Sequence, residues 1–363
     1  MNLGICTYRF FIVFTLLSAL LSCTEDHPPR SVLLPGSLGE HDEVLVVMNK
    51  DLWKGESGKL LRSILTHPYD VLPQDEPTFE VSHITFNHFI NLHKKHRNVL
   101  FAGVVNDGSA QAKFTRDHCG KKVVSKGLEE GNKSFHVSKN DYSKPQTIIH
   151  LLAANAKDLE EVIENDMSAV MDILLNSELK KYHISAFYPG INPELTKLMS
   201  EKFDINLPIP MDWKIAREAE NFVWLRKESP EVGQSIMVTV GSLNGEIETH
   251  DAEGIGFHNR GIEWRNRLGK KYIQTQIEDA YITTDSVLPV VARRISLNNN
   301  VAFENRGLWG AVGDVMGGPF VNYFIHDEKN NRVVFLEGFV YAPATTKKKA
   351  IRQLEAILAG VGI

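Results

Sequence analysis

The stretch VNYFIHDEKNNRVVFLEGFVYA, Val321–Ala342, decides the fold class of the second half of this chain. Aromatic and β-branched residues alternate on both sides of a short polar segment, and such residues suit the half-buried surface of a sheet. Asn330 and Asn331 stand at the centre, where a tight turn requires residues that tolerate unusual backbone angles. The pattern predicts two antiparallel strands joined by a turn.

Strand and helix patterns alternate along the rest of the chain. Short apolar runs predict strands at Glu43–Met48, Asn98–Val105 and Gln146–Ala153. Helical spacing is found in Leu52–Leu65, Thr85–Arg97 and the long amphipathic segment Asp158–Lys181. The polar stretch Asn106–Tyr142 predicts a loop or a hairpin, and the basic segment Gly256–Tyr272 predicts either a surface helix or a contact with acidic polymer or lipid.

This order of elements predicts an α+β fold class with two similar lobes. We expect an N-terminal lobe over residues 43–182 and a C-terminal lobe over residues 183–363 that ends in the hairpin and a helix. Each lobe should hold a mainly antiparallel sheet with helices packed on one face. The segment at Leu72 has a counterpart at Leu207, which indicates internal duplication. Helix and strand periodicity alone also makes unrelated segments look alike, so both interpretations stay open.

The N-terminus has the pattern of a secretory signal. Arg9 precedes the apolar run Phe10–Leu21, which is shorter than the ~20 residues that cross a bilayer core. LLSC, Leu20–Cys23, resembles the bacterial lipobox, which implies cleavage after residue 22 and lipid on Cys23. We expect a lipoprotein signal peptide over 1–22 and a flexible tether over 23–42. A short uncleaved anchor is the alternative.

Lipid on Cys23 would hold the protein at a membrane without crossing it. The acidic segment Thr24–Asp26 resembles the signal that sends some bacterial lipoproteins to the outer face of the outer membrane, although an ordinary polar tether is an equal interpretation. We therefore expect a lipid-anchored outer-membrane protein, on the periplasmic side or at the cell surface.

The net charge and the cysteine count argue against a nucleic-acid partner and against an intramolecular disulfide. The formal net charge is −5, and cleavage would remove Arg9 and no acidic residue, which argues against a nucleic-acid partner. Of the three cysteines, Cys6 would leave with the signal and Cys23 would carry lipid, so Cys119 has no partner for an intramolecular disulfide. A packed core must therefore supply the stability.

The segment ENRGLWGAVGDVMGGPF, Glu304–Phe320, is the richest candidate for a site. Its glycines permit positive φ or the close approach of another group. Arg and Trp are enriched where binding energy concentrates. We take Arg306, Trp309, Asp314 and Glu337 as candidate binding residues. The alternative is a tight turn between two strands with a buried Trp.

Catalytic and metal signatures are weak. The chain has no Gly-x-Ser-x-Gly and no HExxH motif. A cluster of four histidines comprises His83, His88, His93 and His96. His93 and His96 are three apart and would share one face of a helix, but no second pair with such spacing completes a zinc site. Neither a metal nor a cofactor is therefore expected. A glycosidase-like pair among Asp314, Asp327 and Glu337 depends on a separation that the sequence does not supply.

Several segments resemble a family of uncharacterised bacterial lipoproteins whose domain is of unknown function. They include EVLVVMNKDLWKGESGKLLR, NFVWLRKESP, RGLWGAVGDVMGGPF and HDEKNNRVVFLEGFVYAP. The resemblance runs from about Glu43 to Leu358 and brings no catalytic residue, cofactor or substrate.

The sequence thus favours a non-catalytic binding or assembly module of the cell envelope. Its partners would be the membrane, through Cys23, and an envelope protein or polymer. Two alternatives stay open: an envelope hydrolase with an unrecognised carboxylate site, and a structural spacer lipoprotein. Whether the protein is an enzyme is left undecided.

Overall fold

The computed structural model describes residues 33–90, 93–129, 131–242 and 255–363. Contacts divide the chain into Met1–Pro35 and Gly36–Ile363. The predicted signal peptide, Cys23 and the first half of the predicted tether lie outside the described residues. The predicted end of the tether at residue 42 is corrected, because the backbone N–H of Leu38 donates to Lys95 O and the N–H of Arg97 donates to Leu38 O, both at 2.9 Å. The folded unit therefore begins at Gly36, ahead of Glu43.

The N-terminal sheet is mostly parallel. Its strands are β1 (Glu43–Val47), β2 (Glu80–Ile84), β3 (Asn98–Phe101), β4 (Phe135–Lys139) and β5 (Thr147–Leu151), in the order β2-β1-β3-β5-β4. Strand β1 runs parallel to β2 and β3, and β3 runs parallel to β5, whereas β4 is antiparallel to β5. The prediction of a mainly antiparallel sheet in this lobe is wrong. The continuous buried runs of β1, β3 and β5 are typical of parallel strands that are covered on both faces.

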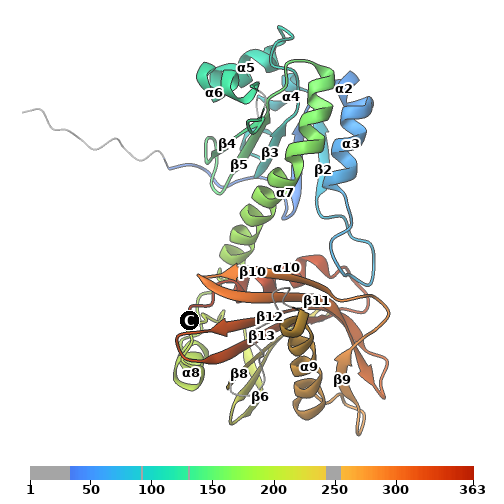
Figure 1. The fold of residues 1–363 in the computed structure, drawn as a ribbon, viewed down its shortest axis with the longest axis vertical. Coiled ribbons are helices and arrows are strands. Elements are labelled where there is room, and N and C mark those ends of the chain that lie inside the picture. The colour runs from blue at the N-terminus through green and yellow to red at the C-terminus, as the bar shows by residue number, and fades with distance from the viewer. Residues whose placement is uncertain (1–32, 91–92, 130, 243–254) are drawn as a thin grey trace, which may run out of the picture. The chain divides into compact units, whose positions relative to one another are not determined.

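Helices cover both faces of this sheet, not one face as predicted (Figure 1). The elements between and after the strands are α2 (Lys50–Lys54), α3 (Glu56–Leu65), α4 (Phe86–Phe89), η1 (His93–Lys95), α5 (Ala110–Cys119), α6 (Lys121–Gly127) and α7 (Ala156–Ala186). One core joins the sheet to α3 and α7. Phe89 of α4 and Phe114 of α5 pack on the opposite face.

The polar stretch Asn106–Tyr142 is not a loop or a hairpin, since it forms α5, α6 and β4. Helix α5 buries Ala112, Thr115 and Cys119, which recur at helical spacing. These side chains are small or polar, so the apolar period that marks an amphipathic helix is weak in the sequence.

The second sheet is antiparallel and curled (Figure 1). Its strands are β6 (Lys214–Ala219), β7 (Phe222–Glu228), β8 (Gly233–Ser242), β9 (Tyr281–Thr284), β10 (Val291–Leu297), β11 (Asn300–Val312), β12 (Gly317–Asp327) and β13 (Arg332–Tyr341). They follow the order β10-β11-β12-β13-β8-β7-β6, and β9 also pairs with β11. The predicted hairpin is confirmed as β12 and β13, with Asn331 at φ 49° in the turn.

Helices α8 (Pro193–Phe203) and α10 (Lys348–Leu358) pack on one face of this sheet. Helix α9 (Ile255–Tyr272), the predicted basic segment, packs on the other face through Trp264 and Leu268. Aromatic side chains dominate the core beneath α9. In the described part of the chain, no helix has the length and apolar character needed to cross a membrane.

The structure does not confirm two similar lobes. Strands of the first sheet are mostly parallel and those of the second are antiparallel. The segment after Leu72 leads into the parallel strand β2, whereas the segment after Leu207 leads into the antiparallel strand β6. Helix α7 also crosses the predicted boundary at residue 182, because its residues from Leu159 to Leu174 pack in the first core and Ala186 packs in the second.

Candidate functional site

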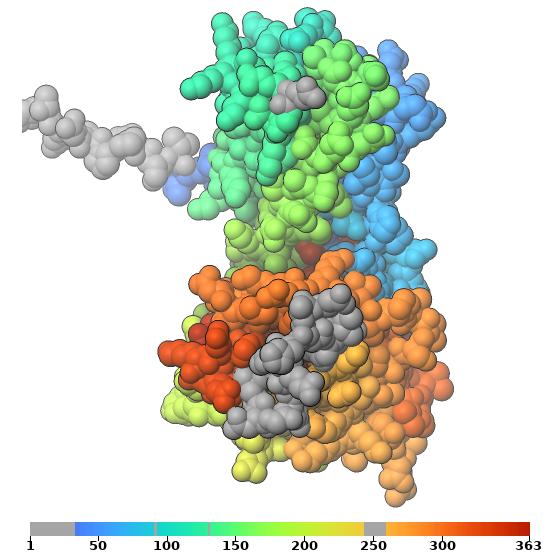
Figure 2. Space-filling view, viewed as in Figure 1, coloured from blue at the N-terminus to red at the C-terminus, as the bar shows by residue number. Residues whose placement is uncertain are grey.

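A cleft of about 970 Å³ opens between α7 and the antiparallel sheet, beside the loop that follows α3. We call it the central cleft. Figure 2 shows a hollow between the green of α7 and the orange of β10, with the dark red of α10 at its bottom. The volume falls at the upper end of the range of small-molecule sites, about 300–1,000 Å³.

The helical wall of the central cleft is formed by α7 and α3, two amphipathic helices that share one core with the N-terminal sheet. Helix α7 begins at Asn155, whose side chain accepts from the N–H groups of Lys157 and Asp158. Its main apolar stripe is buried against the N-terminal sheet, and the neighbouring Met171 and Leu175 remain half-buried at the cleft. Apolar groups therefore share this wall with polar ones, since Ser168, Asp172 and Asn176 also line it.

Arg306 of β11 is the central charge of the opposite wall. Its Nε and Nη2 donate to the two carboxylate oxygens of Glu304, at 2.8 and 3.0 Å. The two residues are two positions apart on one strand and therefore share a face. Arg306 Nη1 donates to the hydroxyl of Tyr69 at 2.8 Å and also bonds Glu355 of α10. The guanidinium is bound in the bidentate manner that gives strong charge-assisted hydrogen bonds.

Burial and charge together determine the protonation states of this group. Burial opposes the charge of Glu304, but Arg306 outweighs it and holds the pKa of Glu304 below its usual value. Burial likewise opposes the charge of Arg306, and the carboxylates of Glu355 and Glu304 raise the pKa of Arg306 well above its usual value. Burial raises the pKa of Tyr69, so its hydroxyl keeps its proton and donates to Glu355 at 2.7 Å.

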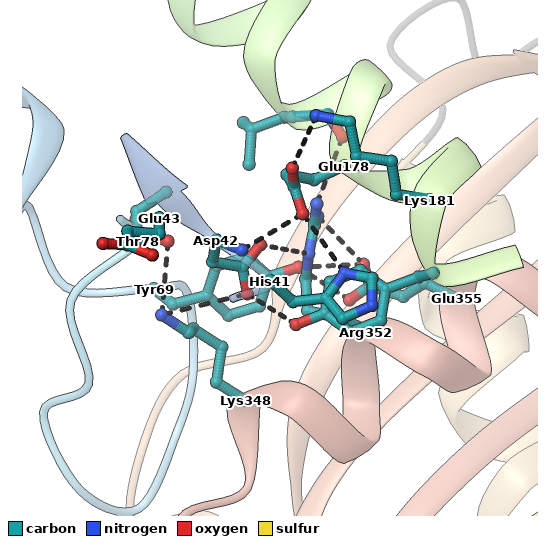
Figure 3. A network of polar contacts seen from close by, with 12 residues as sticks. His41, Asp42, Glu43, Tyr69, Thr78, Glu178, Lys181, Lys348, Arg352 and Glu355 are labelled. Atoms are coloured by element: carbon teal, nitrogen blue, oxygen red, sulfur yellow. Dashed lines mark hydrogen bonds and ion pairs between the residues drawn. The ribbon is translucent and has the colours of Figure 1, made fainter. Parts of the chain in front are cut away.

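A second polar network continues from Arg352 on the cleft floor toward β1 and α7 (Figure 3). Glu178 is fully buried and accepts from Lys181 Nζ at 2.9 Å. Asp42 accepts from the hydroxyl of Tyr182 at 2.7 Å and lies 3.7 Å from Arg352 Nε. Burial raises the pKa of Asp42, whereas the partners of Glu178 outweigh its burial and lower its pKa. The network thus joins the start of β1 to α7 and α10 through buried charges.

Most charges that line the central cleft are paired with one another, and Asp172, exposed on α7, is the exception among the described residues. Arg306 is matched by Glu304 and Glu355, and Arg293 at the rim is paired with Asp70. A carboxylate whose pKa is lowered is ionised near neutral pH and has no proton to donate. The arrangement suits binding better than general acid catalysis.

Trp309 lies on the opposite face of β11 and does not reach the cleft. It is 2% exposed, and its Nε1 donates to Val340 O at 3.0 Å. Gly318 faces it across the strand pair, where an added Cβ would lie 2.0 Å from Val340 O. The glycine-rich segment is therefore a strand-turn-strand unit around a buried Trp, with positive φ at Gly313 in the turn.

Glu337 is also on the face beneath α9. It is 0% exposed, and its Oε1 lies 3.1 Å from Nε of the equally buried Arg265. Asn322 Nδ2 approaches the other carboxylate oxygen at 3.4 Å. Burial raises the pKa of Glu337 to about 7, although Arg265 opposes the shift. Glu337 is thus a core residue, separated from Arg306 by the sheet.

Asp314 lies in the turn between β11 and β12, where its Oδ1 accepts from the N–H of Val315 at 2.7 Å. Glu337 pairs in register with Asn322, and β12 begins at Gly317. Five strand residues span about 17 Å, which exceeds the separation of about 5–9.5 Å between glycosidase carboxylates. Asp314 and Glu337 do not form such a pair, and Asp327 is bound to Arg332 at 2.5 Å.

Metal-binding and thiol chemistry find little support in the described ranges. No group of three or more His, Cys, Asp or Glu residues in them could hold a metal ion. His118 contacts His150 at 2.8 Å and Asp141 at 3.1 Å within the N-terminal lobe. Cys119 is buried, and burial raises the pKa of its thiol to about 12, so the reactive thiolate is scarce at neutral pH.

Most residues of the central cleft were missed from the sequence. Of the predicted candidates, Arg306 alone lines it. Tyr69 comes from the loop after α3, and Glu355 comes from α10, far along the chain. The available signal was local: Glu304 and Arg306 are two apart on a strand, and Arg352 and Glu355 are three apart on a helix.

Fold and site together define an α+β protein with two unlike sheets and a cleft that combines half-buried apolar side chains with a buried, ion-paired Arg306. Two family models match the chain: Domain of unknown function (DUF8532) over residues 37–185 and Domain of unknown function (DUF4837) over residues 192–360. Together they cover most of the chain, so the predicted resemblance to domains of unknown function is confirmed at that level. No curated protein matches the chain.

Solved structures show only distant likenesses. The Ran-binding protein Mog1p of Saccharomyces cerevisiae is 9% identical with a TM-score of 0.27, and the match covers 44% of this chain and 89% of that one. A variant of Mog1 is 10% identical with a TM-score of 0.28, covering 44% and 90%. Human StAR-related lipid transfer protein 5 is 10% identical with a TM-score of 0.22, covering 53% and 94%. Likenesses at this level carry no argument about function.

Proposed function

We propose that the protein is a lipid-anchored lipoprotein of the bacterial cell envelope and acts as a non-catalytic binding module. The central cleft would receive a peptide segment of a partner protein. The observation that carries the proposal is the combination of half-buried apolar side chains with Arg306, a buried charge that is already ion-paired with Glu304 and Glu355.

A peptide fits this lining better than a glycan does. Ile64, Met171 and Leu175 on the helical wall and Ile295 on β10 would bury apolar side chains of the partner. A glycan would bury less of this apolar surface, because hydroxyl groups cover most of a sugar and only its C–H face is apolar. Because Arg306 is paired within the protein, covering it does not desolvate a free charge.

Charge pairing also favours a binding module over the alternative of an envelope hydrolase. The carboxylates of Glu304 and Glu355 are ion-paired with Arg306. Asp314 lies in the turn between β11 and β12, whereas Glu337 is fully buried on β13. The described residues thus offer no evident acid and nucleophile pair at the central cleft.

Photo-crosslinking in intact cells tests the cleft. A photoreactive residue at Ser168, which is exposed and lines the cleft, should capture a discrete protein. The same residue at Lys180 is the matched control, because Lys180 is exposed on α7 but does not line the cleft. Equal capture from both positions, or capture from neither, would contradict the proposal.

A variant with a blocked cleft distinguishes binding in the cleft from non-specific crosslinking. Ser168→Trp should fill the cleft from an exposed position and abolish capture by a photoreactive residue at Asn176. Lys180→Trp should leave that capture unchanged. The double replacement of Arg306 and Trp309 by Ala is unsuitable, because both side chains are packed and their loss would unfold the protein.

The anchoring part of the proposal rests on the lipobox-like LLSC motif that ends at Cys23, outside the described residues. Cys23→Ser should move the protein from the membrane fraction to the soluble fraction and abolish labelling with an alkyne fatty acid. Continued labelling and membrane association in the variant would refute lipidation at Cys23.

A further inference from the structure

A second hollow, of about 570 Å³, lies at the carboxyl edge of the parallel strands of the N-terminal sheet. Its lining comes from the three segments that follow β1, β2 and β3, and it shares no residue with the central cleft. We call it the strand-edge groove. Neither the sequence candidates nor the proposed peptide cleft accounts for it.

The topology places this groove at a switch point of the sheet. After β1 the chain continues to β2, on one side of β1 in the sheet. After β3, which lies on the other side of β1, it continues to β4 and β5, which lie still further out on that side. The connection after β1 packs α3 on one face, whereas the connection after β3 packs Phe114 of α5 on the opposite face. The crevice where two such connections diverge, at the carboxyl ends of the strands, is the usual ligand position in open parallel sheets.

A side-chain amide occupies the floor of this crevice. Gln111 Nε2 donates to Val47 O at 3.2 Å and to Ala102 O at 3.3 Å, at the carboxyl ends of β1 and β3. Gly103 makes room for it, since an added Cβ would lie 2.8 Å from that nitrogen. The amide is therefore held in place by the strand ends while its residue lines the groove.

The rest of the lining is polar and nearly neutral. It includes the amide of Asn87, the carboxylates of Asp51 and Asp107, and the ammonium of Lys50. Within the described ranges no residue bonds the side chains of Asn87 or Asp51, and both residues are exposed. Phe86 adds an apolar surface. Carboxylates outnumber ammonium groups, which disfavours a phosphate or another polyanion.

We propose that the strand-edge groove binds a neutral saccharide. A sugar hydroxyl both donates and accepts hydrogen bonds, so neighbouring hydroxyls can pair with the amides and carboxylates together. The apolar C–H face of a sugar ring can pack on Phe86. The groove is separate from the central cleft, so this inference does not depend on the peptide partner.

Calorimetric titration of the full-length, detergent-solubilised protein with maltotriose, cellotriose and chitotriose tests the proposal, and inorganic pyrophosphate serves as the anionic comparison. At least one trisaccharide should bind. The double variant Asp51→Ala/Asn87→Ala should weaken that binding by about tenfold or more. Gly103→Ala should weaken it as well, because the new Cβ would lie 2.8 Å from Gln111 Nε2 and displace the amide from its place at the strand ends.

Two controls distinguish the groove from other surfaces. Asp117→Ala, at an exposed position of α5 outside the lining, should bind the saccharide as the unaltered protein does. The cleft-blocking Ser168→Trp should also leave it unchanged, so failure of the peptide proposal and failure of this one are separable. Absence of binding by all three saccharides, equal binding by the double variant, or preference for pyrophosphate would overturn the inference.

Discussion

Replacing Glu337 by Gln should change how the stability of the protein depends on pH. Glu337 is fully buried, and burial raises the pKa of its carboxyl from 4.5 to about 7 in spite of Arg265. A carboxyl with a raised pKa binds its proton more tightly in the folded protein than in the unfolded chain. Its contribution to stability is complete below the unfolded pKa, declines as pH rises through the interval from 4.5 to about 7, and is lost above it.

The size of the effect follows from that interval. At about 1.4 kcal/mol per pKa unit, the shift corresponds to roughly 3 kcal/mol. Gln has the shape of Glu and cannot ionise, so it stands for the protonated carboxyl beside Arg265. The free energy of unfolding of the unaltered protein, relative to that of E337Q, should therefore fall by roughly 3 kcal/mol between about pH 4.5 and pH 8.

Equilibrium urea unfolding at a series of pH values, followed by Trp fluorescence, measures this difference. Glu328→Gln, at an exposed position of the β12–β13 turn, is the matched control for the same chemical change at the surface. If the unaltered protein gained stability over E337Q as pH rose, Arg265 would be holding Glu337 ionised and the reasoning would be refuted. A flat difference for E337Q would refute it as well.

Three further predictions concern buried side chains and their packing. Arg306→Met should lower the free energy of unfolding by about 3–5 kcal/mol, because it leaves its buried carboxylate partners without a cation, whereas Arg293→Met at a half-exposed pair should cost less than about 1 kcal/mol. Similar losses in urea unfolding would contradict this contrast. Trp309→Ala should lower the free energy of unfolding by about 3–5 kcal/mol, because the Trp side chain is buried. Gly318→Ala should also lower Tm, because its Cβ would lie against the carbonyl oxygen of Val340 in β13. An unchanged Tm in either variant would contradict this account of the packing. Cys119 should react with iodoacetamide slowly in the folded protein and fast in urea, since burial raises its pKa to about 12; rapid labelling without urea, read by mass spectrometry, would show that the thiol is accessible.

The elements that the sequence predicted correctly are those in which one face of a regular element is apolar over a long distance. The β12–β13 hairpin alternates over many residues, and α7 repeats apolar residues over several turns. In both cases the local period is also the packing pattern, so no knowledge of distant partners was needed. Helix α5 was not predicted, because the residues on its buried face are small or polar and give no apolar period.

The central cleft could not be predicted in the same way. Arg306 was chosen for its residue type, but its environment depends on Tyr69 and Glu355, which lie hundreds and tens of residues away in the chain. Trp309 and Glu337, the other candidates on the strands, are buried on the other face of the sheet. Successive side chains of β11 point alternately to the face with the cleft and to the face beneath α9. A shift of one position along the strand therefore moves a side chain from one face to the other.

By itself the sequence determined the α+β class, the terminal hairpin and the long helix, because these follow from local periodicity. The proposal of a lipid anchor also rests on the sequence, because the LLSC motif at Cys23 is a local pattern that needs no partner elsewhere in the chain. Strand direction in the first sheet, the mutual neutralisation of Arg306 and Glu355, and the burial of Glu337 were decided by tertiary structure alone. Each of these depends on which distant segments meet, and hydrophobic patterning does not encode that choice locally.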